Sequence, residues 1–375
     1  MNGNYAETDR RAFLRTLGAG ALGLAFSGVG QTAQTKPLRG VFPIGQTPFT
    51  QADKLDLECL ANEVKFCNRY KVHGFAWPQI ASGWATLSEQ ERLDGAEAIL
   101  SAGKGGKTVL VIGVQTQGTV LDKSIMFAKH AAKNGADAIV SLPPEKADDN
   151  GMIEYYKAIG KATDLPLFVQ SQGDMSVDLI VKMFEEIPTF KCVKDEAGNP
   201  LARITQIRER TKDKLAVFSG NGVRTMIDEM RLGFSGHCPT TGLSDFYAAA
   251  FDLWHGGKHR EAFDMFGRLQ AFSTITGASN YLMVMRGIFK EDTKSRGMGG
   301  LSGVPSGPGE AMGGGGGGMG RGGAGGGGGR AGGRGPAVPL DETGKQAVRD
   351  AWAEFMKPHL RGSGGAGFSA CGPAF

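Results

Sequence analysis

The chain has 375 residues, and its 42 Lys and Arg against 38 Asp and Glu give a formal net charge of +4. This excess is too small to indicate a nucleic-acid or membrane surface by itself, and we expect no nucleic-acid partner. The five cysteines have no close spacing, which excludes a disulfide framework, and no apolar run reaches the ~20 residues of a membrane span.

Residues 1–35 are predicted to be an export signal and not part of the fold. The pair Arg10-Arg11 precedes an uncharged, weakly apolar stretch at 16–29. This pattern is typical of a twin-arginine signal, and the alternative is a disordered basic N-terminus. The prediction implies the twin-arginine export machinery as a partner and a periplasmic location.

From residue 36 to residue 255, short apolar runs alternate with stretches of helical periodicity. The runs are 41–44, 74–77, 108–112, 137–141, 167–169, 190–193, 215–219 and 234–238. They lack polar alternation, as strands buried on both faces do. Eight strand–helix units predict an α/β protein with a (β/α)₈ TIM barrel. A doubly wound open sheet is the alternative, weakened because no G-x-G-x-x-G follows the first run. Ser88 and Glu91 predict a capping box at one helix start.

Further helices are predicted at 260–272, 280–289 and 342–355, so residues 256–296 and 336–360 form a C-terminal helical part. Between them, residues 297–335 are dominated by glycine. Such a segment cannot bury enough apolar surface to offset its ordering entropy, and we expect a disordered insertion. Residues 361–375 are predicted to be a flexible tail.

Lys194 ends the sixth apolar run, at the position where barrel enzymes place catalytic groups. A lysine there is unfavourable to desolvate as a cation, so its free amine should be available as a Schiff-base nucleophile. The same residues also allow a simple ion pair of Lys194 with Asp195 or Glu196 at the strand end.

The segment at 193–198, Val-Lys-Asp-Glu-Ala-Gly, resembles the (I/V)-K-(E/D)-x-(S/T/A)-G segment around the Schiff-base lysine of the dihydrodipicolinate synthase / N-acetylneuraminate lyase family. Other segments resemble that family in the same order and spacing. They are Thr-Pro-Phe at 47–49, Ala-Ser-Gly at 81–83 followed by 86–92, Asp-Leu-Pro-Leu at 164–167, Ser-Gly-Asn-Gly at 219–222, and 232–236.

The resemblance implies a class I lyase, an aldolase or dehydratase acting on pyruvate or another 2-keto acid without metal or organic cofactor. Lys194 would form an imine with the keto carbon, and a homo-oligomer is expected. The implied substrate-binding residues are Thr47, Ala81, Ser82, Gly83, Gln170, Gly220, Asn221 and Cys238. From the residues alone, Ser82 could instead cap a turn.

Two segments depart from the family pattern. Pro144 stands where the family carries a proton-relay tyrosine, and Gln170 lies in an altered fifth-strand segment. Glu145 and His237 are the candidate replacement acids, and their alternatives are a solvated loop residue and a packed residue. These departures leave a second function open, an exported barrel that binds a keto acid or sugar acid without turnover.

Overall fold

The computed structural model describes residues 36–220, 223–275, 278–296 and 340–360. The predicted export signal, glycine-rich insertion and C-terminal tail therefore lie outside the described residues. Within those ranges, no helix combines the length and apolar character needed to cross a bilayer.

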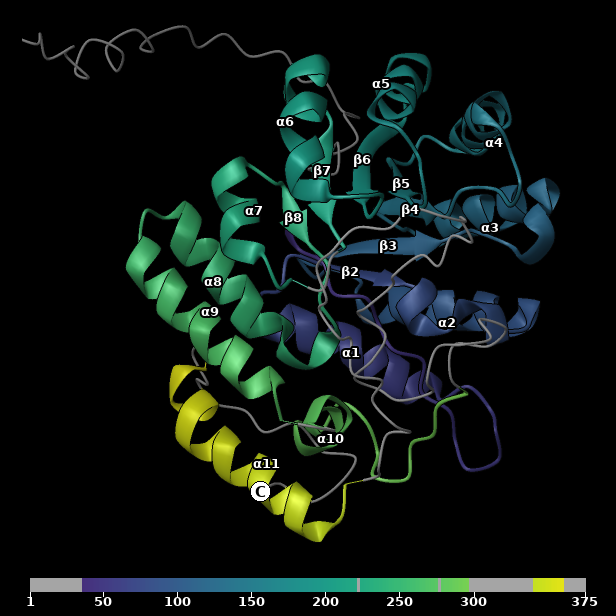
Figure 1. Ribbon diagram of the computed structural model, residues 1–375. Helices are drawn as coiled ribbons and strands as arrows, with labels where there is room; N and C mark the ends of the chain where they lie inside the picture. Colours follow the sequence, from purple (N-terminus) through teal and green to yellow (C-terminus); the bar gives the residue numbers. More distant parts are fainter. Residues whose placement is uncertain (1–35, 221–222, 276–277, 297–339, 361–375) are drawn as a thin grey trace, which may run out of the picture. The chain divides into compact units, whose positions relative to one another are not determined.

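The eight strands that the described ranges contain form one parallel sheet in the order β1-β8-β7-β6-β5-β4-β3-β2. They are β1 (Gly40–Val41), β2 (Gly74–Trp77), β3 (Val109–Gly113), β4 (Ala138–Ser141), β5 (Leu167–Ser171), β6 (Phe190–Asp195), β7 (Ala216–Ser219) and β8 (Gly236–His237). The predicted (β/α)₈ barrel is confirmed, and the open-sheet alternative is wrong (Figure 1).

The ring closes between β1 and β2 through a single bridged residue. Ile44 pairs in parallel with Ala76 on one side and with Thr240 on the other. The amide of Ala76 donates to Pro43 O at 3.0 Å, and the amide of Gly45 donates to Ala76 O at 2.9 Å. Because Pro43 has no N–H to donate toward β2, the first predicted strand is regular only at its start.

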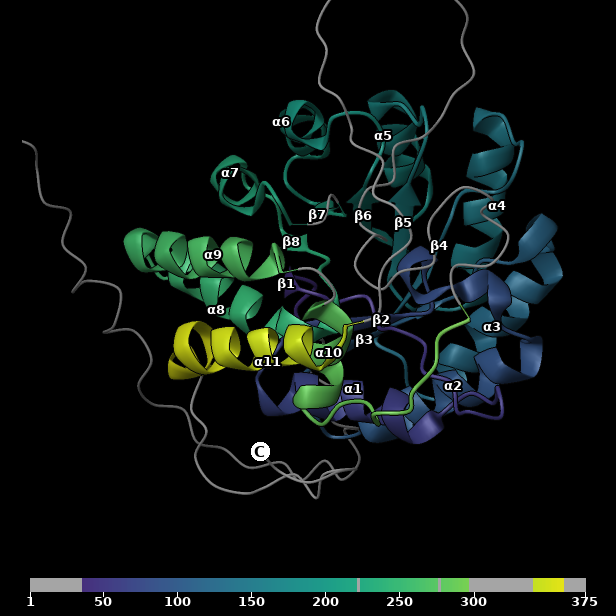
Figure 2. The same ribbon diagram turned by 60° about the horizontal axis from the view of Figure 1, so that its bottom comes forward.

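Helices alternate with the strands and cover the outside of the barrel (Figures 1 and 2). Their bounds are α1 (Leu57–Arg69), α2 (Glu89–Ala102), α3 (Leu121–Lys133), α4 (Asp149–Ala162), α5 (Val177–Glu186), α6 (Pro200–Thr211), α7 (Met226–Leu232), α8 (Ser244–His255), α9 (His259–Ser273), α10 (Ala278–Met285) and α11 (Glu342–Ala351). The capping box predicted at the start of α2 is confirmed, since Ser88 Oγ accepts from the Glu91 amide and the Glu91 carboxylate accepts from the Ser88 amide.

Apolar side chains fill the inside of the barrel. Phe218 packs against Phe42 and Phe168, with ring centroids 4.9 and 5.3 Å apart. The cluster is completed by Ile44, Ala76, Val109, Val111, Ala138, Val140, Cys192 and Cys238. A separate and larger apolar layer lies between the strands and the helices. The barrel interior is therefore filled by apolar side chains and is not a channel.

The C-terminal helices pack on one side of the barrel, next to α8 (Figure 2). Trp352 follows α11 and contacts the ring of Phe246 on α8, at a centroid distance of 5.7 Å. Arg286, just after α10, donates two hydrogen bonds to the Asp245 carboxylate, at 2.8 and 2.7 Å. Both charged side chains are buried, at 4% and 2% exposure, so this ion pair anchors the C-terminal part to the barrel.

Candidate active site

Lys194 lies at the carboxyl end of β6 and points into the barrel mouth. Cys192 belongs to the interior cluster, and side chains two residues apart on a strand face the same way. The Lys194 Nζ donates to Gln79 Oε1 at 3.1 Å. Gln79 follows β2, which is four strands away from β6 in a ring of eight. The Lys194 side chain therefore extends across the mouth to reach Gln79. Lys194 is only 6% exposed.

The carboxylate of Glu196 is the ion-pair partner of Lys194. Glu196 Oε1 lies 2.9 Å from Lys194 Nζ, and Gln170 Nε2 donates to Glu196 Oε2. Gln170 stands directly beside Lys194 on the neighbouring strand β5. A Cβ at Gly220 would lie 1.9 Å from Glu196 Oε1, so the glycine leaves the space that the carboxylate occupies. Lys194, Glu196, Gln170 and Gly220 therefore form one contiguous site.

Asp195 points the opposite way, toward α6. Ser171 Oγ donates to its Oδ1 at 2.5 Å, and Arg203 Nε donates to its Oδ2 at 3.0 Å. The Ser171 hydroxyl also accepts from the amide of Glu196 at 3.1 Å. Asp195 thus fixes the end of β6 against β5 and α6, and the ion-pair partner of Lys194 is Glu196.

Cys238 follows β8 and lies in the same mouth. Burial raises the pKa of its thiol to about 12; the charge of Lys194 opposes this rise and the charge of Glu196 adds to it. The thiol is therefore neutral at physiological pH. Its amide donates to Ser219 O at 3.1 Å, which leaves that N–H engaged in the sheet. The predicted substrate residue Asn221 lies outside the described residues.

The loop after β2 is held by the hydroxyl groups of its own Ser82 and of Thr47 in the loop after β1. Ser82 Oγ donates to Gly45 O at 2.6 Å and accepts from the Gln79 amide at 3.0 Å. Thr47 Oγ1 donates to Ser82 O and accepts from Trp77 Nε1 at 3.0 Å. The turn-capping alternative for Ser82 is thus the arrangement observed. Together these contacts place Gln79 beside Lys194.

The other two residues predicted in this loop have different roles. Ala81 packs against the interior cluster, so the loop lies over the barrel mouth. Gly83 has a φ of 66°, a left-handed conformation that favours glycine, and it lets the chain turn toward α2. The loop therefore reaches the mouth, with the Ser82 hydroxyl engaged by the Gly45 carbonyl and the Gln79 amide.

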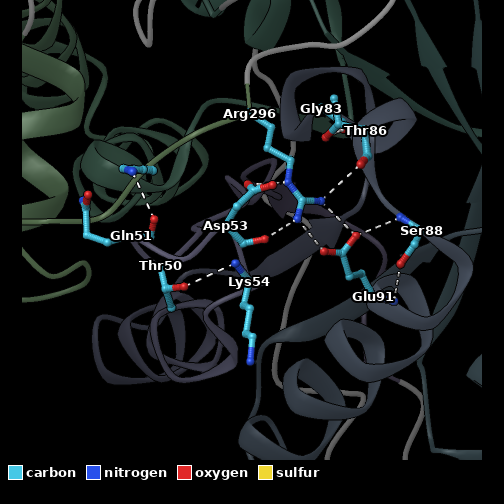
Figure 3. Close-up of polar contacts among 10 residues, drawn as sticks. Thr50, Gln51, Asp53, Lys54, Gly83, Thr86, Ser88, Glu91 and Arg296 are labelled. Atoms are coloured by element: carbon cyan, nitrogen blue, oxygen red, sulfur yellow. Dashed lines mark hydrogen bonds and ion pairs between the residues drawn. The ribbon is translucent and has the colours of Figure 1, made fainter.

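Arg296 joins this loop to the loop after β1 (Figure 3). Its guanidinium donates to Asp53 Oδ1 at 2.7 Å, to Thr86 O at 3.3 Å and to Glu91 Oε2 at 2.9 Å. The guanidinium carbon also lies 3.9 Å from the centroid of the Phe49 ring. Partial burial raises the pKa of the Glu91 carboxyl, but the hydrogen bonds from Arg296 and Ser88 outweigh it and the pKa is lowered. One side chain thus holds two of the loops at the mouth, those after β1 and β2.

The two candidate acids lie away from Lys194. His237 is fully buried on the helix side of β8, where its Nδ1 is 2.7 Å from Glu229 Oε2 and its ring contacts Phe251 of α8. Glu145 is exposed, and its carboxylate accepts from the amide of Gly118 at 3.2 Å. The structure brings neither side chain into contact with Lys194.

Two residues of this site were not predicted as functional. No local sequence pattern marks Gln79 as functional, because its side chain reaches Lys194 only through the conformation of the turn after Trp77-Pro78. Glu196 had a signal: it occupies the variable position of the segment around the lysine, where the alternation of side chains places it on the same face as Lys194.

The chain is similar to known proteins in sequence and in fold. A family described as "Dihydrodipicolinate synthetase family" matches residues 37–283. The 4-hydroxy-tetrahydrodipicolinate synthase of Methanosarcina mazei is 30% identical over 195 residues, which is 50% of this chain and 65% of that protein. The chain thus matches less than two thirds of the length of this curated relative.

Solved structures share the fold at low sequence identity. The dihydrodipicolinate synthase of Rhodopseudomonas palustris superposes with a TM-score of 0.65 at 18% identity, covering 85% of this chain and 98% of that one. A prophage protein of the dihydrodipicolinic acid synthase family from E. coli K12, solved in complex with pyruvate, superposes with a TM-score of 0.64 at 16% identity, with coverages of 85% and 98%. The family match spans more than half of the sequence, and the chain belongs to the dihydrodipicolinate synthetase family.

Proposed function

We propose that the chain is a class I lyase that carries pyruvate or another 2-keto acid as a Schiff base on Lys194. The observation that carries the proposal is the position of this lysine. It is buried at the carboxyl end of β6, points into the mouth, and is in contact with a carboxylate that can exchange protons with it. The family membership and the pyruvate complex of the E. coli relative support the same reaction class.

The chemistry follows from the surroundings of the amine. A neutral Lys194 attacks the keto carbon, and the protonated imine that results withdraws electrons from the adjacent carbon, where a bond to carbon or oxygen is made or broken. The apolar cluster inside the barrel, which includes Phe42, Phe168 and Phe218, excludes water from the inner end of the mouth. This exclusion strengthens electrostatic interactions around Lys194. Gln79 holds the amine in the centre of the mouth.

The reaction we propose is broader than dihydrodipicolinate synthesis. Pro144 follows β4 at the position where the family pattern has its proton-relay tyrosine, and proline carries no transferable proton. The proposal therefore covers keto-acid lyases as a class. The part of the substrate that is attached to or added to the keto acid is to be identified by screening.

The test is reductive trapping. The protein is incubated with each member of a 2-keto acid panel and borohydride, and the adduct is located by peptide mass spectrometry. We expect an adduct with pyruvate on Lys194, which the substitution Lys194→Ala removes. Lys191→Ala is the matched control, because Lys191 is exposed on the same strand. If no keto acid leaves an adduct on the wild-type protein, the proposal fails in favour of a barrel that binds without turnover.

We also propose export through the twin-arginine route and assembly into a homo-oligomer. Replacing Arg10 and Arg11 by Lys should retain the protein in the cytoplasm, because lysine lacks the planar guanidinium fork. Cell fractionation measures this, and unchanged export would contradict the signal. Sedimentation velocity tests the assembly, and a single monomeric species at micromolar concentration would contradict it.

A further inference from the structure

We infer that Glu196 is the acid–base residue that moves protons between Lys194 and the keto oxygen, in the role for which the family pattern has a tyrosine at the position of Pro144. The inference rests on the proposed function, and it assigns the proton transfers to a residue of this chain that lies outside the tyrosine segment.

The carboxylate of Glu196 is already at the reacting atom. Its Oε1 lies 2.9 Å from Lys194 Nζ, within the range in which a proton passes directly between heavy atoms. Among the described side chains, no other carboxylate lies within ion-pair distance of this amine. Glu145 is exposed and bound to a loop amide, and His237 is bound to Glu229 behind β8. The neutral thiol of Cys238 has its pKa raised by burial, so it is a poor proton donor.

The surrounding residues hold the carboxylate in this position. Gln170 Nε2 donates to the oxygen of Glu196 that does not face the lysine, which leaves the other oxygen directed at Nζ. Gly220 leaves room for Oε1, since a Cβ there would lie 1.9 Å from it. The Glu196 side chain is 20% exposed, so its carboxylate is accessible to a small molecule entering the mouth. Gln170 and Gly220 are accordingly positioning residues for Glu196.

The proton transfers balance with this one carboxylate. Glu196 first takes a proton from the ammonium of Lys194, which leaves a neutral amine and a carboxylic acid. The nitrogen lone pair attacks the keto carbon, the carbonyl electron pair moves to oxygen, and Glu196 returns its proton to that oxygen. The carboxylate then takes a second proton from the nitrogen and gives it to the hydroxyl. The carbon–oxygen bond breaks, water leaves, and the protonated imine forms beside a regenerated carboxylate.

A purely electrostatic ion pair would behave in the opposite way. If Glu196 only held Lys194 as a cation, its removal would favour the neutral amine and speed up imine formation. If Glu196 moves the protons, its removal slows imine formation by about 10²–10⁴-fold, the usual contribution of general acid–base catalysis. The two roles are therefore separated by the sign of the change.

The experiment measures the rate of borohydride trapping of pyruvate in Glu196→Gln, Glu196→Asp and Glu196→Ala. We expect Glu196→Gln to be slowed within the range given above, Glu196→Asp to be slowed less, and formate to restore part of the rate of Glu196→Ala by supplying a carboxylate. The matched control is Glu185→Gln, the same exchange at an exposed position on α5. Circular dichroism verifies that each variant is folded.

The possible failures are distinguishable. Trapping on Lys194 that is as fast or faster in Glu196→Gln than in the wild-type protein would overturn this inference and leave the Schiff-base proposal intact. Slowed trapping in Glu196→Ala without rescue by formate would also overturn it, because a structural role is not restored by a free carboxylate. A wild-type protein that forms no adduct with any keto acid would overturn both proposals.

Discussion

The guanidinium of Arg296 and the carboxylate of Glu91 lie 2.8 Å apart, although 205 positions separate the two residues in the chain. Glu91 caps the first turn of α2, and Arg296 follows the C-terminal helix α10. The same guanidinium binds Thr86 O and the Asp53 side chain, so one residue from outside the barrel holds two of the loops at the mouth, those after β1 and β2 (Figure 3).

Replacing Arg296 by Ala should weaken keto-acid binding more than it slows imine formation. The loop after β2 carries Gln79 and Ser82, and its release disorders the contacts around Lys194 without removing the amine. We expect the pyruvate concentration for half-maximal trapping to rise about tenfold, equivalent to about 1.4 kcal/mol, with a nearly unchanged maximal rate. Arg231→Ala, which removes an exposed arginine from α7, is the control. A lower maximal rate at unchanged half-saturation would contradict this role.

The substitution Gly220→Ala should slow trapping while the protein remains folded. Its methyl group would collide with Glu196 Oε1, so the carboxylate must move away from Lys194. We expect the rate of trapping to fall at least tenfold, a decrease like the one expected for Glu196→Gln. Gly267→Ala on α9 is the control, because a Cβ there meets no atom within 4 Å. Equal trapping rates in wild-type and Gly220→Ala proteins would show that the carboxylate position is not critical.

Breaking the buried ion pair between Arg286 and Asp245 should destabilise the protein. Arg286→Met leaves a buried carboxylate without its two charged hydrogen bonds. We expect the free energy of unfolding to fall by about 3–5 kcal/mol, measured by denaturant titration. Arg231→Met, at an exposed pair, should change it by less than about 1 kcal/mol. A change at Arg286 as small as at Arg231 would mean that the C-terminal helices are held by their apolar contacts alone.

The buried carboxyl of Glu63 should make stability depend on pH near neutrality. Burial on α1 raises its pKa from 4.5 to about 8, against the opposing hydrogen bonds from Thr241 and the Gln46 amide. At pH values between 4.5 and about 8, the Glu63 carboxyl is deprotonated in the unfolded chain and still protonated in the folded protein. The contribution of Glu63 to the free energy of unfolding is therefore fully present below pH 4.5 and is lost as the pH rises through about 8.

Glu63→Gln removes this titration. The stability of the variant relative to the wild-type protein should increase with pH by up to about 1.4 kcal/mol per pH unit across that window, measured by thermal or denaturant unfolding at several pH values. Glu209→Gln, exposed on α6, should show no such trend. A difference between Glu63→Gln and wild type that stays constant with pH would mean that Glu63 is ionised in the folded protein.

Much of the fold was predictable because its signals are local. Strands buried on both faces are continuous apolar runs, and each of the eight predicted runs overlaps an observed strand whose bounds differ from it by at most a few residues. The largest differences are at the first and last runs, where Pro43 interrupts the ladder and β8 is only Gly236–His237. Regular pairing there depends on contacts with distant strands that a local pattern does not contain.

The candidate site was predictable where a residue lies on a strand. Lys194 and Gln170 were placed correctly by their positions at strand ends, and they stand side by side. His237 is a candidate acid only because it lies beside the eighth-strand loop, and its alternative as a packed residue is the arrangement observed. Its neighbour Gly236 faces the interior, so alternation directs His237 to the helices. Gln79 was not predicted, because its place depends on a loop conformation that Ser82 stabilises from within the loop and Thr47 stabilises from the loop after β1.

The closure of the barrel at Ile44 has a consequence for its motions. Between β1 and β2 the ring is held by a one-residue bridge, whereas β5 and β6 pair over five residues. Local opening therefore begins at this junction, and the amides of Gly45 and Ala76 should exchange with deuterium faster than those at the centre of β5. Gly45 also accepts the hydrogen bond that fixes Ser82, so opening at this junction should release the loop beside the lysine, and a keto acid bound in the mouth should slow exchange at Gly45 and Ala76.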